Sequence, residues 1–193
     1  MLWRRDLGTI KAVFLDRDGV INEYPGDADY VKSWEEFRFL PKVKSALKRL
    51  SQEGCKIFII SNQAGVSKGV YSQEKLYLIT KNMLEELRKD NIDITGVYYC
   101  IHKTEDNCSC RKPKTGLIDT AISGLKESGL KIEPSNSYFI GDTIRDIETG
   151  KNAGLKTILV FSGKEKPQNQ NNWQTLPDFV FPDLSTAVEK EIL

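Results

Sequence analysis

The chain has 193 residues, of which 28 are basic and 27 acidic, and its formal net charge is +1. This length suits one domain with a substantial core, and we expect a single domain over residues 1–193. Because the net charge is close to zero, the protein has no overall electrostatic attraction for nucleic acid or for an anionic membrane. No segment approaches the roughly 18 apolar residues of a membrane span, and charges interrupt the first ten residues. These properties predict a cytoplasmic protein with small partners.

Five short apolar runs predict strands that are buried on both faces, because they are rich in β-branched and aromatic residues and do not alternate with polar ones. They are KAVFL (11–15), CKIFII (55–60), GVYYC (96–100), SYFIG (137–141) and KTILVF (156–161). Segments of helical period lie between or beside them, at 42–54, 72–90, 115–129 and 143–154. Since strands and helices alternate, we expect a three-layer, Rossmann-like α/β fold with a parallel sheet.

The C-terminal part of the chain has a different pattern. The polar stretch SGKEKPQNQNNWQTLPD (162–178) predicts an exposed loop. It precedes a last short strand, FVF (179–181), and a last helix, LSTAVEKEI (184–192). We therefore expect the loop to lie at the surface.

Polar side chains follow the predicted strands at the point where each strand ends, which is where α/β folds bind ligands. They are Asp16 and Asp18, Ser61 and Asn62, Asp142 and Asp146, and, after the cysteine cluster that follows the third strand, Arg111 and Lys112. Buried carboxylates that converge on one crevice imply a bound cation, because an unpaired buried charge costs several kcal/mol. Oxygen ligands of this kind suit Mg²⁺ together with a phosphate. A hydroxyl, a lysine and a divalent cation around a carboxylate predict a site for phosphoryl transfer.

Each of these residues also has an ordinary structural interpretation. Asp142 could cap the helix that follows it, with Asp146 as a solvated acid on that helix. Ser61 and Asn62 could be turn residues, and Lys112 could be a surface lysine. Because all of these interpretations would have to hold together, we favour the catalytic one.

The segments FLDRDGV, Ser61, Lys112 and GDTIRD resemble, in order and spacing, the four motifs of the haloacid dehalogenase (HAD) superfamily of aspartate-nucleophile phosphatases. With SNQAGVSKG and YYCIHKTEDNCSCRKP added, they resemble the branch that contains heptose 1,7-bisphosphate and histidinol phosphatases. The resemblance runs from about residue 11 to residue 161. It implies a HAD fold and the hydrolysis of a phosphomonoester.

The resemblance also implies a role for each acid. Asp16 would be the nucleophile that carries an aspartyl-phosphate, and Asp18 would be the general acid and base. Mg²⁺ would be bound by Asp16, Asp142 and the backbone carbonyl of Asp18. Asp146, one helical turn after Asp142, would orient the water shell of the metal.

The remaining residues of the motifs would bind the substrate. By the same resemblance, Ser61 and Lys112 would hold the oxygens of the transferred phosphoryl group. Arg111 is a bidentate donor suited to a second phosphate or to another polar group. We also assign Asn62 and Tyr30 to substrate binding.

Four residues of one loop predict a zinc site. Cys100, His102, Cys108 and Cys110 form a C-x-H and C-x-C pattern, and His102 is the only histidine in the chain. A Cys₃His set suits tetrahedral Zn²⁺, and four protein ligands leave no position for a reacting water. We therefore expect a structural zinc loop at about residues 100–110, which holds the following basic residues at the crevice. A redox-sensitive group of thiols is the alternative.

The spacing of the motifs limits the architecture around the crevice. The intervals from Asp18 to Ser61 and from Ser61 to Lys112 are taken up by one helix each, with an adjoining strand or the zinc loop. We therefore expect no large cap domain, and an open crevice bordered by the zinc loop and the loop NEYPGDADYVKSW (22–34).

The substrate implied by the resemblance is a small phosphorylated sugar. The reaction it implies is removal of the C7 phosphate of a heptose 1,7-bisphosphate. Thr143 and Thr115 replace a lysine and a proline that the heptose enzymes often carry, so histidinol phosphate stays open as a substrate. A nucleic-acid 3′-phosphate would also enter an open crevice, although the neutral charge balance opposes it. The remaining hypothesis is a binding module that is stabilised by zinc and has no catalytic activity. The oligomeric state does not follow from the sequence.

Overall fold

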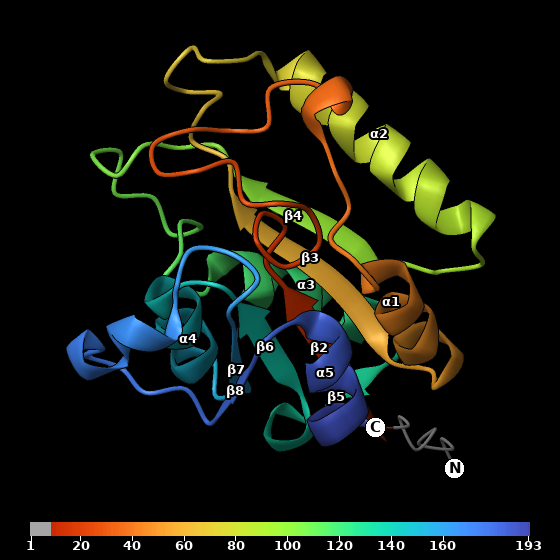
Figure 1. Ribbon diagram of the computed structural model, residues 1–193. Coiled ribbons are helices and arrows are strands. Elements are labelled where there is room, and N and C mark those ends of the chain that lie inside the picture. Colours follow the sequence, from red (N-terminus) through yellow and green to blue (C-terminus); the bar gives the residue numbers. More distant parts are fainter. Residues whose placement is uncertain (1–8) are drawn as a thin grey trace.

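The computed structural model describes residues 9–193 (Figure 1). The expectations about the first ten residues and about a domain that begins at residue 1 fall partly on residues 1–8, which lie outside the described residues. Among the residues from Thr9 onward, no helix has the length and the apolar character needed to cross a bilayer.

The predicted strands and helices are present, with boundaries that move by one or two residues at most ends. The strands are β1 (Thr9–Ile10), β2 (Ala12–Leu15), β3 (Lys56–Asn62), β4 (Gly96–Cys100), β5 (Lys131–Ile132), β6 (Tyr138–Gly141), β7 (Lys156–Val160) and β8 (Phe179–Phe181). The helices are α1 (Val43–Gln52), α2 (Gln73–Lys89), α3 (Gly116–Glu127), α4 (Ile144–Asn152) and α5 (Leu184–Ala187).

Six of the strands form one sheet in the order β4-β3-β2-β6-β7-β8, and every neighbouring pair in it is parallel. All four residues of β2 are buried, as expected of a central strand covered on both faces. One apolar cluster joins the sheet to α1, α2 and α5, and a second joins it to α3. Helix α4 packs on β6 and β7, with Gly150 against Phe139 of β6, which belongs to the second cluster (Figure 1). The α/β prediction of three layers is therefore confirmed.

Three features of the fold differ from the expectation. β1 and β5 pair in a small parallel sheet of their own, which the sequence did not predict because each strand has only two residues. The last helix was expected at 184–192, but α5 ends at Ala187 and a π-helical segment, Val188–Ile192, follows it. The predicted loop at 162–178 contains a short 3₁₀ helix, Pro167–Asn172.

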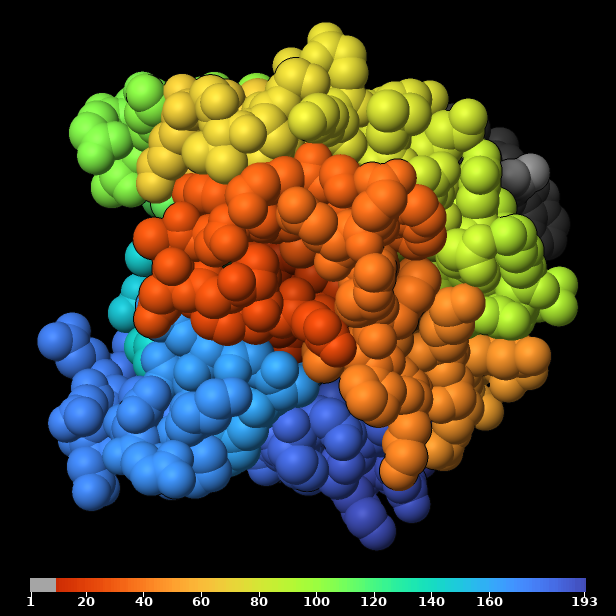
Figure 2. Space-filling model, turned by 45° about the horizontal axis from the view of Figure 1, so that its top comes forward, coloured from red at the N-terminus to blue at the C-terminus, as the bar shows by residue number. Residues whose placement is uncertain are grey.

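The carboxyl ends of the central strands open on one face of the molecule. In Figure 2 the red and orange chain that follows β2 lies between the yellow segment after β3 and the light-blue segment after β7. That chain is a loop with one short 3₁₀ helix, Trp34–Glu36, before α1 begins. The parallel sheet therefore brings the segments after β2, β3 and β7 to one place.

Candidate active site

The polar residues at the strand ends line one cleft of about 370 Å³. The cleft is lined by Asp16, Asp18, Tyr30, Ser61, Asn62, Lys112, Asp142 and Asp146, together with parts of the loop at 22–34 and of the chain after β7. The backbone N–H of Asp16 still donates to Ile140 of β6, at 3.0 Å, so the sheet fixes this residue at the base of the cleft. All predicted site residues outside the cysteine loop, except Arg111, thus meet here.

Lys112 is buried between two carboxylates. Its Nζ lies 2.8 Å from Oδ2 of Asp16 and 2.6 Å from Oδ1 of Asp146, and the residue is 3% exposed. Burial opposes the charged form of this lysine, but the two carboxylates outweigh burial and raise its pKa above the usual range. Lys112 is therefore a fixed positive charge in the cleft, and its interpretation as a surface lysine is wrong.

Asp16 and Asp142 are carboxylates that burial makes difficult to ionise. Burial raises the pKa of Asp16 to about 6, although Lys112 acts in the opposite direction. Asp142 is 2% exposed, and burial followed by the charges of Asp146 and Asp16 raises its pKa well above the usual value. Ligand atoms of Asp16, Asp142 and Asp146 lie within 4.8 Å of one another. A divalent cation bound by oxygens of Asp16 and Asp142 would balance their buried negative charge, so these two residues fit a Mg²⁺ site.

Two glycines leave room for Asp142. A Cβ atom at Gly19 would lie 2.2 Å from Oδ2 of Asp142, and one at Gly163 would lie 2.0 Å from the same atom. Gly19 also has a φ of +83°, which residues with side chains rarely adopt. Backbone therefore packs directly against Asp142, and the N–H of Lys164 donates to its Oδ2 at 2.7 Å.

Asp146 has a function that the sequence did not suggest. Its Oδ2 accepts from the N–H of Thr143 at 3.1 Å and from the Thr143 hydroxyl at 2.6 Å, while its Oδ1 is bound to Lys112. Since both oxygens are occupied, Asp146 fixes Lys112 in place and closes the first turn of α4. Thr143 is the N-cap of α4, so the capping interpretation of Asp142 is wrong.

Asn62 and Arg111 hold the backbone of the loop that carries Lys112. Asn62 accepts from the N–H of Lys112 at 3.1 Å and donates to its carbonyl at 3.3 Å. Arg111 donates to the carbonyl of His102 at 3.1 Å and lines a neighbouring hollow with Arg145 rather than the main cleft. The structure therefore shows Asn62 as an anchor of Lys112 at the cleft wall, and sets Arg111 to one side.

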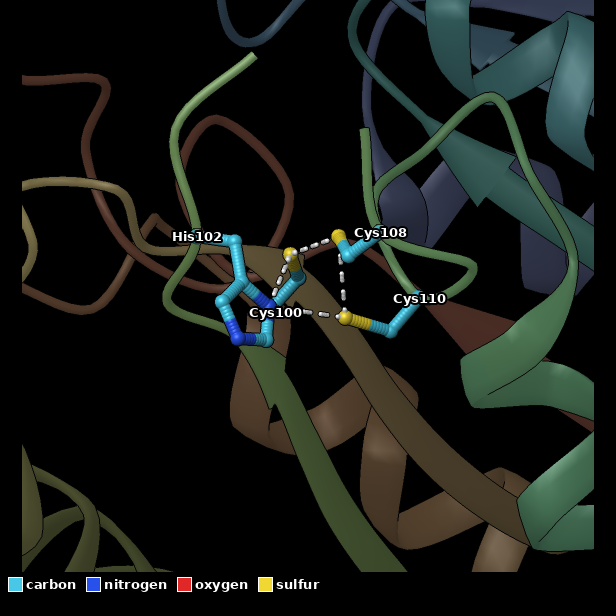
Figure 3. A group of neighbouring side chains, drawn as sticks. All are labelled: Cys100, His102, Cys108 and Cys110. Carbon is cyan, nitrogen blue, oxygen red and sulfur yellow. Dashed lines mark hydrogen bonds between the residues drawn. The ribbon is translucent and has the colours of Figure 1, made fainter. Parts of the chain in front are cut away.

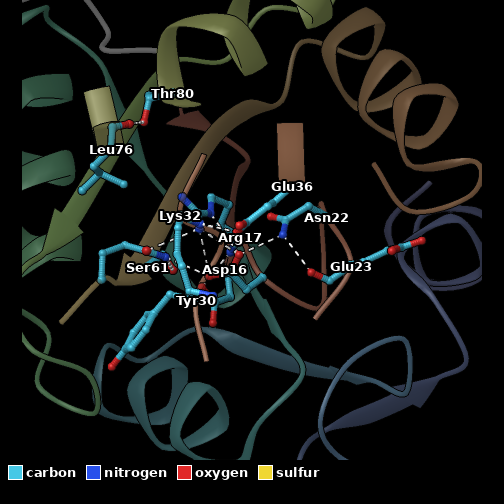
Figure 4. A network of polar contacts seen from close by, with 12 residues as sticks. Asp16, Arg17, Asn22, Glu23, Tyr30, Lys32, Glu36, Ser61, Leu76 and Thr80 are labelled. Atoms are coloured by element: carbon cyan, nitrogen blue, oxygen red, sulfur yellow. Dashed lines mark hydrogen bonds and ion pairs between the residues drawn. The ribbon is translucent and has the colours of Figure 1, made fainter. Parts of the chain in front are cut away.

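Asp18 is held by side chains that sequence reasoning missed. The guanidinium of Arg17, which is completely buried, lies 2.9 Å from Oδ1 of Asp18. Asn22 donates to the same oxygen at 2.8 Å, and Gln63 donates to Oδ2 at 2.9 Å. Figure 4 shows Arg17 between Asn22 and Ser61. The available signal was the position of Arg17 between the two aspartates and of Gln63 directly after Ser61 and Asn62.

The four predicted zinc ligands also meet, at the end of β4 (Figure 3). Cys100 Sγ lies 3.6 Å from Cys108 Sγ and 3.8 Å from Nδ1 of His102. Cys110 Sγ lies 3.3 Å from Cys108 Sγ and 3.2 Å from the same histidine nitrogen. Bonds of about 2.0–2.3 Å to tetrahedral zinc separate neighbouring ligand atoms by roughly 3.5–3.8 Å. The spacing therefore fits Zn²⁺, and all four cysteines of the chain are free thiols.

Comparisons with known proteins agree with this geometry. A HAD-hydrolase-like family model matches residues 109–187. The chain is 36% identical over 161 residues to the D-glycero-beta-D-manno-heptose-1,7-bisphosphate 7-phosphatase of Haemophilus influenzae. This alignment covers 80% of this chain and 83% of the relative. It is 36% identical over 190 residues to the D-glycero-D-manno-heptose-1,7-bisphosphate 7-phosphatase of Chlorobaculum tepidum, with 95% and 94% covered.

A solved structure extends the likeness to three dimensions. The crystal structure of D,D-heptose 1,7-bisphosphate phosphatase from B. bronchiseptica, complexed with magnesium and phosphate, has a TM-score of 0.81 and 28% identity to this chain. The match covers 94% of this chain and 97% of that one. The fold and the cleft thus define a phosphatase of the HAD-like hydrolases. Within that class, the chain belongs to the family that contains these heptose-1,7-bisphosphate 7-phosphatases.

Proposed function

We propose that this protein is a Mg²⁺-dependent phosphatase that removes the C7 phosphate of D-glycero-D-manno-heptose 1,7-bisphosphate. The observation that carries the proposal is the group Asp16, Lys112 and Asp142 at the base of an open cleft. The relatives named above support the choice of substrate. Relatives named for the beta and for the alpha anomer are both similar to this chain, at 36% and 34% identity.

The reaction would proceed in two transfers. A carboxylate oxygen of Asp16 attacks phosphorus, and the bond from phosphorus to the sugar oxygen breaks while Asp18 gives that oxygen a proton. Asp18 then takes a proton from water, which attacks the aspartyl-phosphate and releases inorganic phosphate. Asp16 is regenerated as a carboxylate and Asp18 as an acid, so the cycle closes without any further reactant.

Lys112 and Ser61 would hold the phosphoryl oxygens during both transfers. A lysine has three N–H donors, and Lys112 directs two of them at Asp16 and Asp146. The third remains for an oxygen of the substrate. Ser61 is 2% exposed and lines the cleft, so its hydroxyl is a second donor at the same place. Tyr30 in the wall of the cleft would contact the polyol part of the sugar, as would Asn62.

Two metals would complete the protein. Asp16 and Asp142 would hold Mg²⁺, which neutralises negative charge on the phosphoryl group as it is transferred. Cys100, His102 and the other two cysteines of the cluster would hold a structural Zn²⁺. Zinc bound by thiolates suits the reducing cytoplasm, where we place the enzyme.

Phosphate release in the presence of Mg²⁺ tests the proposal. The panel contains both anomers of the heptose bisphosphate, histidinol phosphate and a 3′-phosphorylated oligonucleotide. We expect the highest kcat/KM with a heptose bisphosphate, and removal of Mg²⁺ by a chelator should stop turnover. A higher kcat/KM with histidinol phosphate or with the oligonucleotide would overturn the choice of substrate. Turnover of no compound would favour the binding module.

A further inference from the structure

The side chain of Gln63 lies at the centre of a buried network behind the cleft. We infer that Gln63 is a positioning residue, which fixes the carboxylate of Asp18 for proton transfer and is itself fixed by Tyr71. The inference rests on the proposed function, in which Asp18 delivers the proton to the leaving oxygen. It assigns roles to two residues that the four motif positions do not include.

Gln63 is completely buried and uses every polar group it has. Its backbone N–H donates to the carbonyl of Cys100 at 2.7 Å, which ties it to the end of β4. Its Nε2 donates to Oδ2 of Asp18 at 2.9 Å and to the hydroxyl of Ser61 at 3.2 Å. Its Oε1 accepts from Tyr71 at 2.5 Å and from Arg17 at 3.3 Å. The side chain thus has one contact to the proposed proton carrier and one to the proposed phosphate-binding hydroxyl.

The chemistry of the neighbours sets the orientation of this amide. Arg17 has donors only, so the amide oxygen of Gln63 must face it. The NH₂ group of Gln63 then faces Asp18, which as a carboxylate has acceptors only. The opposite orientation would place two donors against each other at Arg17 and two acceptors against each other at Asp18. Only one of the two amide orientations therefore satisfies the site.

Gln63 is the main hydrogen-bond donor to Oδ2 of Asp18, whereas Asn22 and Arg17 make their shortest contacts with Oδ1. Asn22 and the shortest contact of Arg17 both reach Oδ1, at 2.8 and 2.9 Å. Oδ2 is held by Gln63 at 2.9 Å and by Arg17 at 3.1 Å. Without Gln63, Oδ2 would keep a single side-chain contact, the one to Arg17 at 3.1 Å. Gln63 therefore fixes the angle at which Asp18 meets the cleft.

Tyr71 fixes Gln63 from the other side. Tyr71 is 4% exposed, and burial raises the pKa of its phenol, so the hydroxyl stays a donor to Gln63. A Cβ atom at Gly65 would lie 2.2 Å from the ring of Tyr71, which shows how closely the backbone packs there. The ring also lies 5.9 Å from the ring of Tyr30, which lines the cleft. The side chain of Tyr71 thus lies between Tyr30 of the cleft wall and Gln63.

The test compares two phosphate esters that need the proton to different degrees. A sugar alkoxide leaves with difficulty unless it is protonated, whereas the nitrophenolate of p-nitrophenyl phosphate leaves as a stable anion. Gln63→Leu keeps the approximate size of the side chain and removes its hydrogen bonds. We expect kcat/KM to fall by roughly 10²-fold for heptose bisphosphate and by less than about threefold for p-nitrophenyl phosphate.

Two Tyr→Phe variants form a matched pair. Tyr71→Phe removes the donor to Gln63 and should shift the ratio of the two kcat/KM values in the same direction, by a smaller factor. Tyr99→Phe removes a hydroxyl that contacts Thr80 at 3.1 Å but keeps the ring beside the guanidinium of Arg17. It should leave both kcat/KM values unchanged. Thermal unfolding and zinc content show whether each variant is folded. If Gln63→Leu does not fold, the result with Tyr71→Phe decides the test.

The possible outcomes separate this inference from the proposed function. An equal fall with both esters would mean that Gln63 acts on phosphate binding or on the fold, and would overturn the inference. Unchanged values in Gln63→Leu and Tyr71→Phe would also overturn it. If the wild-type enzyme hydrolyses neither ester with Mg²⁺, the proposed function itself fails.

Discussion

At the scale of single residues, Lys112 determines the electrostatics of the cleft. It is the buried cation between Asp16 and Asp146, and it holds both of them by direct contact. Removing one partner of such a group leaves a buried charge uncompensated, which costs more than an exposed ion pair contributes. The substitutions that test this site should therefore change charge and keep volume.

Asp16→Asn should reduce phosphate release by at least about 10³-fold, because it removes the attacking charge while it keeps the shape of the side chain. The fold should remain, since Asp146 still pairs with Lys112. Steady-state turnover and the circular dichroism of the variant provide the two measurements. Substantial residual hydrolysis would remove Asp16 from the role of nucleophile.

Asp146→Asn should lower kcat by about 10-fold or more and destabilise the fold by about 1–3 kcal/mol. The new amide can accept from Thr143, but its NH₂ group then faces the ammonium of Lys112, and two donors repel. Glu148→Gln on the same helix is the control and should change neither value.

A Mg²⁺ titration distinguishes the two roles of Asp146. A lower kcat at saturating Mg²⁺ supports contact with Lys112, whereas a loss confined to Mg²⁺ affinity supports the water-shell role predicted from the sequence.

At the scale of elements, the cysteine cluster connects β4 to the segment that carries Lys112 into the cleft. Cys100 ends β4, and Arg111 and Lys112 directly follow Cys110. Zinc bound at this cluster would therefore set the course of the chain up to the beginning of α3.

Cys108→Ser should reduce bound zinc well below the one ion per chain that we expect of the wild type, and should lower activity through displacement of Lys112. Cys55→Ser is the matched control, because Cys55 is buried directly before β3 and lies outside the cluster. Metal content measured by mass spectrometry and phosphate release are the two readouts. A wild-type sample that is stable and fully active without zinc would contradict the structural role.

The outer strand β8 depends on an ionised aspartate at its start. Oδ2 of Asp178 accepts from the N–H of Thr157 at 2.7 Å and from its hydroxyl at 2.8 Å, and Lys151 pairs with Oδ1. Burial raises the pKa of Asp178, but Lys151 and Thr157 outweigh burial and hold it below the usual value. A lowered pKa in the folded state stabilises the protein above the unfolded pKa of about 3.9, and this contribution is lost as the pH falls through the folded pKa.

Asp178→Asn should therefore destabilise the fold at about pH 7, and the difference from the wild type should shrink as the pH falls below about 3. Because the group is partly exposed, the effect at neutral pH should be at most about 1 kcal/mol. Urea unfolding of both proteins at the two pH values measures it, with Asp93→Asn as the control. A difference that does not change with pH would show that the charge of Asp178 has no part in it.

At the scale of the whole molecule, the sequence predicted the layers and the main sheet because the apolar runs of the buried strands are unmistakable. It also placed Asp16, Ser61 and Asp142 together, since parallel strands bring their carboxyl ends to one edge. The pairing of β1 with β5 was missed, because two residues have no periodicity. The contacts of Gln63 with Asp18 and of Asp146 with Lys112 were missed for another reason, namely that these partners are distant in the chain and meet only after the sheet forms.

The bare backbone around Asp142 has a consequence for the sequences that this fold can accept. If the codons for Gly19 and Gly163 are each fully randomised, the clones that still release phosphate should encode glycine alone, because any Cβ there would overlap a carboxylate oxygen. The codon for Gly124, where a Cβ would come no closer than 4.0 Å to Tyr98, should return alanine freely. Positions 19 and 163 should therefore tolerate no residue other than glycine, because even the methyl group of alanine is too large.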